Sequence, residues 1–543
     1  MGNCLPLLLF NPIHIFKKKR KPLPIETMFK LPSPLPSWPQ GGLEICQVSS
    51  FNKIWATHEG GPDNLGATFF EPASLPPGFF VLGCYAQPNN RPLSGWVLAG
   101  KDVEGSRTLE MPVDYKLVWS SESVKIKQDG SGYIWIPVAP DGYKAVGFIV
   151  TSSSVKPALD RIRCVQSDFT EASQNDELVW GNPSGINIYG MKPNPIGTRD
   201  PGVCVGTFIA QVNGVTMFPS CLKNKANNLS AMPNLNQIQA LIQTYSPWIY
   251  FHPDESYLPS SVNWFFANGA LLYKQGDLSN SNPLSIDQNG SNLPQGGPND
   301  GTYWLDLPSD GNKKDKVKKG DLPSSEAYFH VRPILGGTFT DIAVWAFYPF
   351  NGGARAKVEF INVSLGKIGE HVGDWEHVTL RISNFTGELW KVFFAEHSSG
   401  TWVDASNLEF QGGNKVVAYS SLHGHASYSK PGLVLQGSGN IGIRNDTAKS
   451  KNVMDTGARY EIISAEYLGD GVVVEPPWLN FSRKWGPKID YDLDSQLNKI
   501  EKILPGKLKT QFEKIVKSLP DEVLGEDGPT GPEMKGNWNG DES

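Results

Sequence analysis

The sequence predicts a mainly β protein, in which a β-prism-like domain precedes a β-sandwich-like domain and helices are few and short. One observation is composition: 56 glycines and 42 prolines among 543 residues exceed their usual joint share of about 12 % and favour turns. The second is that, from about residue 43, short apolar runs are separated by Gly, Pro and Asn, as in a series of strands. A hydrophobic content of 39 % is enough for buried cores and excludes a globally disordered chain.

Charge and cysteine content narrow the function classes. The formal net charge of −6 and the pI near 5.9 argue against a nucleic-acid binder, which usually carries a strongly basic face. No apolar run reaches the about 18 residues that a membrane-spanning helix needs. The six cysteines all lie at or before position 221 and show no CxxC spacing, so we expect free thiols in a reducing compartment.

Residues 1–42 are interpreted as a leader followed by a Pro-rich linker. The leader, MGNCLPLLLFNPIHIFKKKR, places its apolar stretch before its basic cluster, the reverse of a signal peptide. Gly2 and Cys4 are candidate sites for myristate and palmitate, although Pro6 stands where the myristoylation motif prefers Ser or Thr. Because one acyl chain binds membrane only marginally, stable anchoring needs the second chain or the basic cluster. That cluster consists of Lys17, Lys18, Lys19, Arg20 and Lys21. The alternative is an unmodified leader.

Residues 43–225 contain an internal repeat. Its first copy is FEPASLPPGFFVLG at 70–83, and its second is WIPVAPDGYKAVG at 135–147. In both, an aromatic residue and a Pro precede a tight Pro-Gly or Asp-Gly turn, which an aromatic residue and a second Gly follow; this is typical of two strands joined by a turn. A weaker third copy lies at 195–208. Because a β unit that cannot bury its own face packs on its copies, three copies around one axis predict a β-prism.

Two longer segments carry a family resemblance. They are FNKIWATHEGGPDNLGATFFEPASLPPGFFVLGCYAQPNNRPLSGWVLAGKD and GYKAVGFIVTSSSVKPALDRIRCV. Both resemble the plant family named after yeast vacuolar protein sorting-associated protein 62, over roughly residues 43–540. The repeated glycine-aromatic pattern is also similar to the β-prism associated with multivesicular-body sorting subunits. The resemblance implies a role in vacuolar or endosomal membrane traffic, with lipid binding by the prism.

Residues 231–490 are expected to form the second domain. Apolar residues at helical spacing between 231 and 250 predict a short helix that ends before Pro247. Residues 274–326, including the basic run KKDKVKK at 313–319, are predicted to be a long polar loop. Strand patterns return from 328 to about 475. Residues 491–543 are interpreted as a pair of amphipathic helices within 493–519 and a Gly/Pro-rich tail without regular structure.

The candidate site centres on EHVGDWEHVTLRI, residues 370–382. Asp374 and Glu376 are two apart on a predicted strand, so their carboxylates point to one face, and His371, beside Gly373, can reach that face. Two carboxylates on one face repel each other unless a cation, a shared proton or a basic partner neutralises them. A divalent cation would do so, and the oxygen-rich ligand set favours Mg²⁺ or Ca²⁺ over Zn²⁺.

The same segment is similar to the GHRHDWE heptapeptide of the necrosis- and ethylene-inducing-like proteins. These are β-sandwich cytolysins that bind a divalent cation and recognise plant sphingolipid head groups. The resemblance implies that His371, Asp374 and Glu376 are cation ligands and that Asn351 replaces a further acidic ligand. Three positions depart from the motif, namely Glu370, Val372 and Gly373, and they leave lytic activity open.

A second cluster, YSSLHGHASY at 419–428, places His423 and His425 two apart, so both face one way on an extended chain. They are candidates to complete the cation shell or to bind a substrate anion. Two other interpretations of the whole group stay open. One is a buried hydrogen-bonded network that sets strand register. The other is a catalytic centre in which a metal-bound water is the nucleophile.

These features predict a non-enzymatic peripheral membrane protein of the vacuolar or endosomal trafficking type. Its cation site would bind an anionic or sphingolipid head group, its prism would bind lipid or an endosomal sorting protein, and nucleic acid would not be a partner. We expect it in the cytoplasm, on the cytosolic face of the plasma membrane or of endomembranes. The alternatives are a metal-dependent hydrolase that uses the same residues and a sorting adaptor that works through protein contacts alone.

Overall fold

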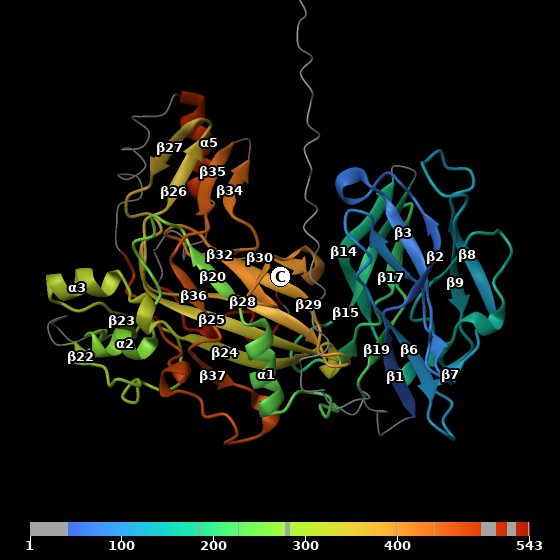
Figure 1. The fold of residues 1–543 in the computed structure, drawn as a ribbon, viewed down its shortest axis with the longest axis horizontal. Helices are drawn as coiled ribbons and strands as arrows, with labels where there is room; N and C mark the ends of the chain where they lie inside the picture. Colours follow the sequence, from blue (N-terminus) through green and yellow to red (C-terminus); the bar gives the residue numbers. More distant parts are fainter. Residues whose placement is uncertain are drawn as a thin grey trace, which may run out of the picture.

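The computed structural model describes residues 42–182, 185–225, 227–276, 283–397, 399–438, 440–489, 506–517, 528–540 and 542. Within these ranges strands predominate, and the chain forms two lobes that lie side by side (Figure 1). The lobe coloured blue to teal holds residues 42–223, and the larger lobe holds the rest. The predicted mainly β class is confirmed. The candidate acylation sites Gly2 and Cys4 and the basic cluster at 17–21 lie outside the described residues.

Three consecutive repeats build the first lobe, and each contributes two small antiparallel sheets. The first repeat has β1 (Leu43–Val48), β2 (Phe51–Ala56), β3 (Ala67–Pro72), β4 (Phe80–Val81), β5 (Tyr85–Pro88) and β6 (Val97–Asp102). The second has β7 (Leu109–Glu110), β8 (Asp114–Ser120), β9 (Tyr133–Val138), β10 (Tyr143–Lys144), β11 (Ile149–Thr151) and β12 (Cys164–Gln166). The third has β13 (Thr170–Glu171), β14 (Ser173–Asn182), β15 (Ile186–Pro193), β16 (Gly202–Val203), β17 (Phe208–Val212), β18 (Val215–Met217) and β19 (Cys221–Lys223).

The glycines of the sequence repeat lie where these units meet. A Cβ atom on Gly83 would lie 2.8 Å from the Cα atom of Gly147, a distance that real Cβ atoms do not adopt, so both positions need glycine. The residues just before these glycines, Leu82 and Val146, are fully buried in one core with Val205 of the third repeat. The weaker third copy predicted at 195–208 is therefore present, and the three units pack together as a β-prism requires.

The second lobe is a two-sheet structure. Its main sheet has the order β30-β29-β28-β25-β24-β37, and the facing sheet has the order β31-β32-β20-β36, with β33 beside β32. The main-sheet strands are β24 (Ala327–Ile334), β25 (Phe339–Asn351), β28 (His371–Ser383), β29 (Leu389–Glu396), β30 (Ser399–Asp404) and β37 (Tyr460–Ser464). The facing strands are β20 (Trp248–Phe251), β31 (Phe410–Gln411), β32 (Lys415–Ser420), β33 (Ser427–Tyr428) and β36 (Val453–Asp455). The largest apolar core lies between the two sheets.

A third, smaller sheet projects from this lobe at the upper left of Figure 1, and we call it, with its helix, the arm. The arm consists of β26 (Arg355–Val358), β27 (Ile361–Ser364), β34 (Gly432–Ser438), β35 (Ile441–Thr447) and α5 (Gly506–Lys517). Its strand order is β27-β26-β35-β34. Phe512 and Val516 of α5 are fully buried against Ala356 and Val358 of β26, so the helix covers one face of the small sheet.

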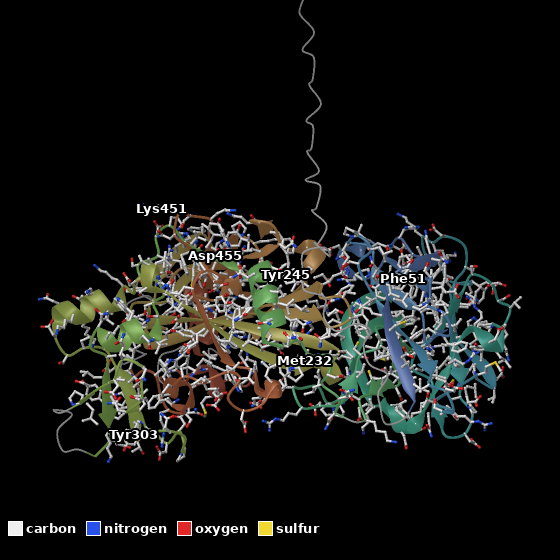
Figure 2. The ribbon with its side chains drawn as sticks, turned by 60° about the horizontal axis from the view of Figure 1, so that its bottom comes forward. Phe51, Met232, Tyr245, Tyr303, Lys451 and Asp455 are labelled. Carbon is white, nitrogen blue, oxygen red and sulfur yellow. The ribbon has the colours of Figure 1, made fainter. Side chains whose placement is uncertain are left out.

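The predicted helix between 231 and 250 is confirmed as α1 (Leu235–Tyr245). Asn234 caps it: its side chain accepts a hydrogen bond from the backbone amide of Gln237, and the Gln237 side chain accepts one from the backbone amide of Asn234. Pro247 follows the last turn, as expected. Figure 2 shows side chains filling both lobes, with Tyr245 of α1 inside the second; its hydroxyl donates to the Gly387 carbonyl at 3.1 Å.

The prediction of a long polar loop at 274–326 is wrong. Following β21 (Leu271–Lys274) and α2 (Val262–Ala267), the segment holds β22 (Leu284–Ser285), β23 (Tyr303–Asp306) and α3 (Gly311–Lys318). The basic run at 313–319 forms most of α3 because Asp310 caps the helix and Val317 is buried in an apolar cluster with the neighbouring strands. A single buried apolar side chain in a helix of eight residues is a weak signal in a stretch so rich in charge.

Short 3₁₀ turns complete the described elements. They are Pro62–Asn64, Leu159–Arg161, Ser167–Phe169, Leu322–Ser324, Leu335–Gly337, Ala405–Asn407, Glu466–Leu468, Pro477–Asn480 and Pro532–Met534. None of the helices in the described part of the chain is both long and apolar enough to span a membrane. The five cysteines within it, Cys46, Cys84, Cys164, Cys204 and Cys221, are free thiols.

The C-terminal segment departs from its prediction. The first of the two helices predicted within 493–519 falls largely outside the described residues, and α5 corresponds to the second. Residues 528–540 and 542, which we call the tail, contain one 3₁₀ turn and dock on the main sheet. Trp538 is only 4 % exposed and stacks on His330 of β24 with 3.6 Å between ring centroids. The buried indole therefore holds in place a segment for which the glycines and prolines predicted no regular structure.

Candidate functional site

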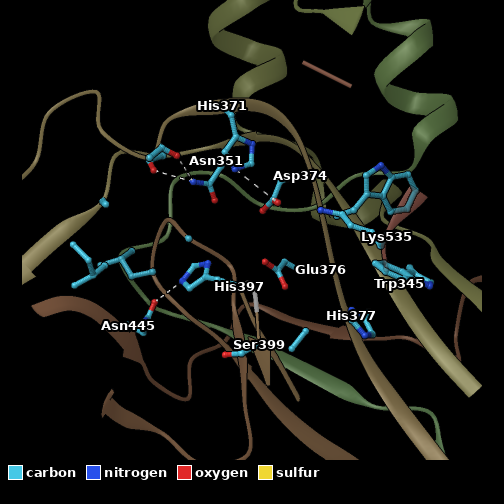
Figure 3. A pocket seen from close by; sticks show the side chains of 18 of the residues that line it. Trp345, Asn351, His371, Asp374, Glu376, His377, His397, Ser399, Asn445 and Lys535 are labelled. Atoms are coloured by element: carbon cyan, nitrogen blue, oxygen red, sulfur yellow. Dashed lines mark hydrogen bonds and ion pairs between the residues drawn. The ribbon is translucent and has the colours of Figure 1, made fainter. Parts of the chain in front are cut away.

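A polar cavity of about 510 Å³ lies where the main sheet, the arm and the tail meet. β25 and β28 contribute Asn351, His371, Asp374, Glu376 and His377 to its lining (Figure 3). The arm contributes Arg355, Arg444 and Asn445, and the tail contributes Lys535, Asn537 and Glu542. Acidic and basic side chains thus line the same cavity, which is large enough for a small ligand.

Strand geometry brings four of the predicted site residues to this cavity. Asp374 and Glu376 alternate along β28 on one face, as the two-residue spacing predicts. In the antiparallel pair of β25 and β28, Asn351 lies directly opposite His371. All four side chains are largely buried, with 6 to 9 % of each residue exposed. In Figure 3, Asp374 and Glu376 lie in the middle of the view, with His371 and Asn351 above them.

Gly373 shapes the start of β28 between His371 and Asp374. Its φ of +66° lies in the left-handed region, and a Cβ atom there would lie 2.6 Å from the carbonyl oxygen of Trp485. Only glycine satisfies both conditions without displacing the neighbouring backbone. The His371 ring then lies over the acidic face: its Nδ1 is 3.3 Å from the Gly373 carbonyl oxygen and its Nε2 is 4.0 Å from Asp374 Oδ1.

His425 lies behind Asp374 and, among the residues that the structure describes, is not part of the cavity lining. Its Nδ1 is 2.8 Å from Asp374 Oδ2, and its Nε2 is 3.0 Å from the Tyr257 carbonyl oxygen. Its ring is fully buried and stacks on Tyr348 with 3.9 Å between centroids. Both ring nitrogens therefore face acceptors, and an imidazole donates to two acceptors only when each nitrogen carries a proton.

His423 also points away from the lining and pairs with a different carboxylate, Glu255. The His423 amide donates to Glu255 Oε2 at 2.6 Å, and its Nδ1 lies 3.5 Å from Glu255 Oε1. The amides of Ser256 and Tyr257 donate to the same carboxylate at 2.9 and 2.8 Å. Burial by itself would raise the pKa of Glu255, but the His423 bonds and the charge of His425 outweigh it, and the pKa is lowered.

The repulsion between the two acidic residues on β28 is relieved in part by His425, which contacts Asp374 from outside the cavity lining. Burial would raise the pKa of Asp374, but the hydrogen bond from His425 and the charges of His371 and His425 lower it. Asp374 is thus favoured as a carboxylate by histidine side chains of the protein itself. The structure supplies the positive partner that the sequence pattern requires, and it does so with a side chain.

The donor types of the four predicted residues in the lining suit a hard divalent cation, since they are two carboxylates, an amide and an imidazole. Their positions do not assemble one. Within the described ranges, no three His, Cys, Asp or Glu side chains converge closely enough to hold a metal ion. One oxygen of Asp374 is taken by His425, and the amide nitrogen of Asn351 donates to the Gly369 carbonyl at 2.7 Å. The side chains in the described part of the chain therefore do not by themselves form a complete cation shell.

The tail supplies a wall of the cavity that sequence reasoning missed. Glu542 is 2 % exposed, pairs with Arg332 of β24 and accepts a hydrogen bond from Thr379 at 2.7 Å. Asn537 Nδ2 is 2.7 Å from His377 Nε2. The only sequence signal for this docking is an isolated tryptophan, Trp538, in the Gly-rich string KGNWNGDES, because a large apolar side chain in such a tail needs a place to be buried.

The arm supplies the basic wall. Arg444 forms a two-bond pair with Asp446, at 2.8 and 2.6 Å, and Arg355 lies 3.7 Å from the same carboxylate. The side-chain oxygen of Asn445 accepts a hydrogen bond from His397 Nε2 at 3.0 Å. Burial lowers the pKa of His397. The cavity therefore has Asp374 and Glu376 on the main sheet, Glu542 on the tail and its two guanidinium groups on the arm.

The fold and the site together define a class of protein. It is a mainly β protein with a three-repeat prism and a two-sheet lobe that carries a cavity of mixed charge. The chain belongs to the family described as vacuolar protein sorting-associated protein 62, whose model matches residues 25–542. The family resemblance found in the sequence is thereby confirmed, and membership supports a role in vacuolar protein sorting.

A curated relative from Saccharomyces cerevisiae, described as putative vacuolar protein sorting-associated protein TDA6, is 27 % identical over 182 residues. The match covers 30 % of this chain, and the chain spans only 37 % of that relative's length.

Solved structures similar to part of the chain include the one titled GNIP1Aa from Chromobacterium piscinae (17 % identity, TM-score 0.27, covering 37 % of this chain and 40 % of that one). Others have the toxin fold of the necrosis- and ethylene-inducing-like proteins. The structure titled NLPPya in complex with glucosamine has 14 % identity and a TM-score of 0.20, covering 35 % of this chain and 66 % of that one. The structure titled non-toxic HaNLP3 protein has 12 % identity and a TM-score of 0.22, covering 41 % of this chain and 74 % of that one.

Proposed function

We propose that this protein is a non-enzymatic, membrane-associated sorting protein whose second lobe binds the polar head group of a lipid in the cavity. The observation that carries the proposal is that one cavity of about 510 Å³ is lined both by Asp374 and Glu376 of β28 and by Arg355 and Arg444 of the arm. A head group that bears both hydroxyl groups and an anionic group would meet acceptors on one wall and guanidinium donors on the other.

Preorganisation supports this role. Asp374 is held by His425, and Arg444 is held by Asp446, so neither side chain has to be ordered when a ligand binds. The aromatic ring of Trp345 also lines the cavity and offers an apolar face beside the charged groups. Small-ligand sites of this type combine apolar walls with a few fixed polar groups.

Cation dependence is a separate and narrower proposal. The present geometry leaves Asp374, Glu376 and His371 short of a complete shell, so Mg²⁺ or Ca²⁺ would bind only together with oxygen atoms of the head group. Under this proposal, neither His423 nor His425 is a cation ligand; they hold carboxylates in place.

Membrane attachment through acyl chains on Gly2 and Cys4, with the lysines and arginine at 17–21 against anionic lipid, completes the proposal. Two weak attachments give stable binding where one does not. We further propose a location on the cytosolic face of the plasma membrane or of endomembranes, with an endosomal sorting protein as a partner of the prism.

The direct test is binding of soluble head groups to the full chain by isothermal titration calorimetry. The probes are glycerophosphoinositol, phosphocholine and N-acetylglucosamine, each with added Mg²⁺, with added Ca²⁺ and with EDTA. We expect at least one probe to bind, and Asp374→Asn and Glu376→Gln to weaken it. Asp114→Asn, an exposed carboxylate of the prism that pairs with Lys156, is the control and should bind as the wild type does.

The outcomes separate the alternatives. Failure of every probe, or equal affinity in the β28 variants and the control, would reject the cavity as the binding site. Equal affinity with EDTA would reject the cation proposal alone. Turnover of a phosphodiester probe that both β28 variants abolish would overturn the non-enzymatic assignment in favour of a hydrolase.

A further inference from the structure

The tail folds around one buried guanidinium group, that of Arg332 on β24. One amino group of Arg332 donates to the backbone carbonyls of Asn537 and Trp538, the second at 3.1 Å, and the other pairs with the Glu542 carboxylate. The Trp538 ring stacks on His330 of the same strand. The lobe therefore holds, at one place, a short segment with an aromatic residue and, four positions later, an acidic residue.

Two further strands of the main sheet contact the acidic residue. Thr379 on β28 donates a hydrogen bond to the Glu542 carboxylate at 2.7 Å, and Nε1 of Trp402 on β30 donates to the Glu542 backbone carbonyl at 3.1 Å. We call His330, Arg332, Thr379 and Trp402 together the tail-binding surface.

The charge of Arg332 requires an acidic occupant on this surface. A second carboxylate, that of Asp341, lies 3.9 Å from the Arg332 guanidinium, but it already accepts two hydrogen bonds from Arg381, at 2.9 and 2.8 Å. Glu542 provides the close ion pair. Because Arg332 is only 2 % exposed, an occupant without an anionic group would leave a buried cation poorly neutralised, which is strongly destabilising.

The tail does not fit this surface completely. In the described part of the chain, Nε of Arg332, Nδ1 of His330 and Oε2 of Glu542 are buried without a hydrogen-bond partner. Oε2 of Glu542 lies 3.6 Å from Nε2 of His377, which is longer than a hydrogen bond. A buried polar atom without a partner costs free energy, so a segment that paired these atoms would bind this surface better than the tail does.

Two cavities adjoin the tail. Lys535 and Asn537 line the cavity of about 510 Å³, and Asn539 lines a second cavity of about 370 Å³, to which Arg332 and the prism residue Thr198 also contribute. Protein interiors are normally close-packed. A segment bordered by two cavities is held by fewer contacts than a core segment, and this makes its exchange for another segment easier.

We propose that the tail-binding surface is a recognition site for a peptide segment of a partner protein, and that the tail occupies it until such a segment displaces it. The partner segment carries an aromatic residue for the His330 ring and, four positions later, an acidic residue for Arg332. A second copy of this chain would offer the same tail, with the same unpaired atoms and without the advantage of attachment, so a different protein is the favoured occupant. This proposal goes beyond head-group binding and does not depend on it.

The test is fluorescence anisotropy of a labelled synthetic peptide of residues 531–543, GPEMKGNWNGDES, titrated with the full chain. The attached tail competes at a high effective concentration, so the wild type should bind the peptide weakly. Full-length protein with Trp538→Ala and Glu542→Gln should bind it about tenfold or more tightly. If circular dichroism shows that this protein does not fold, Glu542→Gln alone, which keeps the indole, replaces it. Met534→Ala, at a position 41 % exposed, is the control and should bind as weakly as the wild type.

Changes in the peptide test the same contacts without altering the protein. The Trp538→Ala and Glu542→Gln peptides should each bind the tail variant about tenfold or more weakly. The Asn539→Ser peptide should bind as the unchanged peptide does, since the Thr198 amide contacts the Asn539 backbone carbonyl. Peptides that keep the tryptophan and the glutamate and vary the residues between them should include tighter binders.

Four results would overturn the proposal. The first is equal binding of the peptide by the wild type and the folded tail variant, and the second is equal binding of the changed and unchanged peptides. The third is a set of varied peptides in which none binds more tightly than the tail sequence. The fourth is a wild-type dimer in solution that Trp538→Ala abolishes, because a second copy would then be the occupant.

Discussion

Nδ1 of His425 lies 2.8 Å from Oδ2 of Asp374, and this buried pair connects the loop after β32 to the acidic face of β28. Neither side chain is exposed by more than a few per cent, with 0 % for His425 and 6 % for Asp374. An ion pair in such surroundings costs desolvation on both sides, so its two members depend on each other. The carboxylate that faces the cavity is for this reason supported from outside the cavity.

The first prediction concerns that dependence. His425→Gln should destabilise the fold by about 3 kcal/mol, because it leaves a buried carboxylate without its charged partner. Asp374→Asn with His425→Gln should cost clearly less than the sum of the two single changes, since the double variant buries no charge at this position. Urea unfolding of the four proteins measures the coupling, and strict additivity would show that the pair is not coupled.

The second prediction concerns Glu542. Burial would raise its pKa, but the charges of His377 and Arg332 and the hydrogen bonds to it hold the pKa well below the usual range. A lowered folded-state pKa stabilises the fold at every pH above the ordinary glutamate value, and this stability is lost as the pH falls below it. The melting temperature should therefore drop between about pH 5 and pH 3, and less so in Glu542→Gln, whereas the exposed control Glu104→Gln should follow the wild type.

The third prediction concerns Glu461, for which the dependence of stability on pH has the opposite sign. Burial, with a contribution from the nearby Glu326, raises the pKa of Glu461 from 4.5 to about 7. Between these two values only the folded state holds the proton, so stability should fall as the pH rises from about 4.5 to about 7 and be constant above that. Glu461→Gln should remove this decline and raise the melting temperature at pH 8 (about one unit above the shifted pKa). A parallel pH profile in wild type and variant would contradict the assignment.

The fourth prediction concerns the tail. Trp538→Ala removes the stack on His330 and should free the segment that carries Lys535 and Asn537, because the indole is its main buried group. We expect faster proteolysis after residue 528, a loss of about 3 kcal/mol and weaker head-group binding. Met534→Ala, at an exposed position of the same tail, is the control, and an unchanged cleavage rate in Trp538→Ala would show that the indole does not order the tail.

The fifth prediction concerns Gly373. Alanine there must adopt a φ of +66° and also bring a Cβ atom to 2.6 Å from the Trp485 carbonyl oxygen. Gly130→Ala is the matched control, since its φ is +71° and no atom lies within 4 Å of the added carbon. The control should lose about 1 kcal/mol through backbone strain alone. Gly373→Ala should lose more, and it should weaken head-group binding by displacing His371 relative to Asp374. Equal losses would show that the close approach to Trp485 is not limiting.

Local sequence patterns were enough for part of this description. The repeat at 70–83 and 135–147 predicted the three packed units because its turn glycines and apolar residues recur at the same spacing. The two-residue spacing of Asp374 and Glu376 predicted their common face, since alternation along a strand depends on nothing else. The helix α1 followed from the helical spacing of its apolar residues. Its end before Pro247 followed because proline has no backbone N–H to donate. Patterns of the same kind failed at 274–326, where charge outweighed the few apolar residues that fold the segment.

What the sequence determined by itself is the β character, the threefold repetition and the set of acidic and imidazole groups on β28, because each arises within one strand or one turn. Only the tertiary structure decided that His425 holds Asp374, that His423 holds Glu255, and that Arg355, Arg444 and the tail line one cavity together with Asp374. These relationships join residues from about fifty to nearly two hundred positions apart in the sequence. They depend on register and on the burial of a few side chains such as Trp538, which local spacing does not encode.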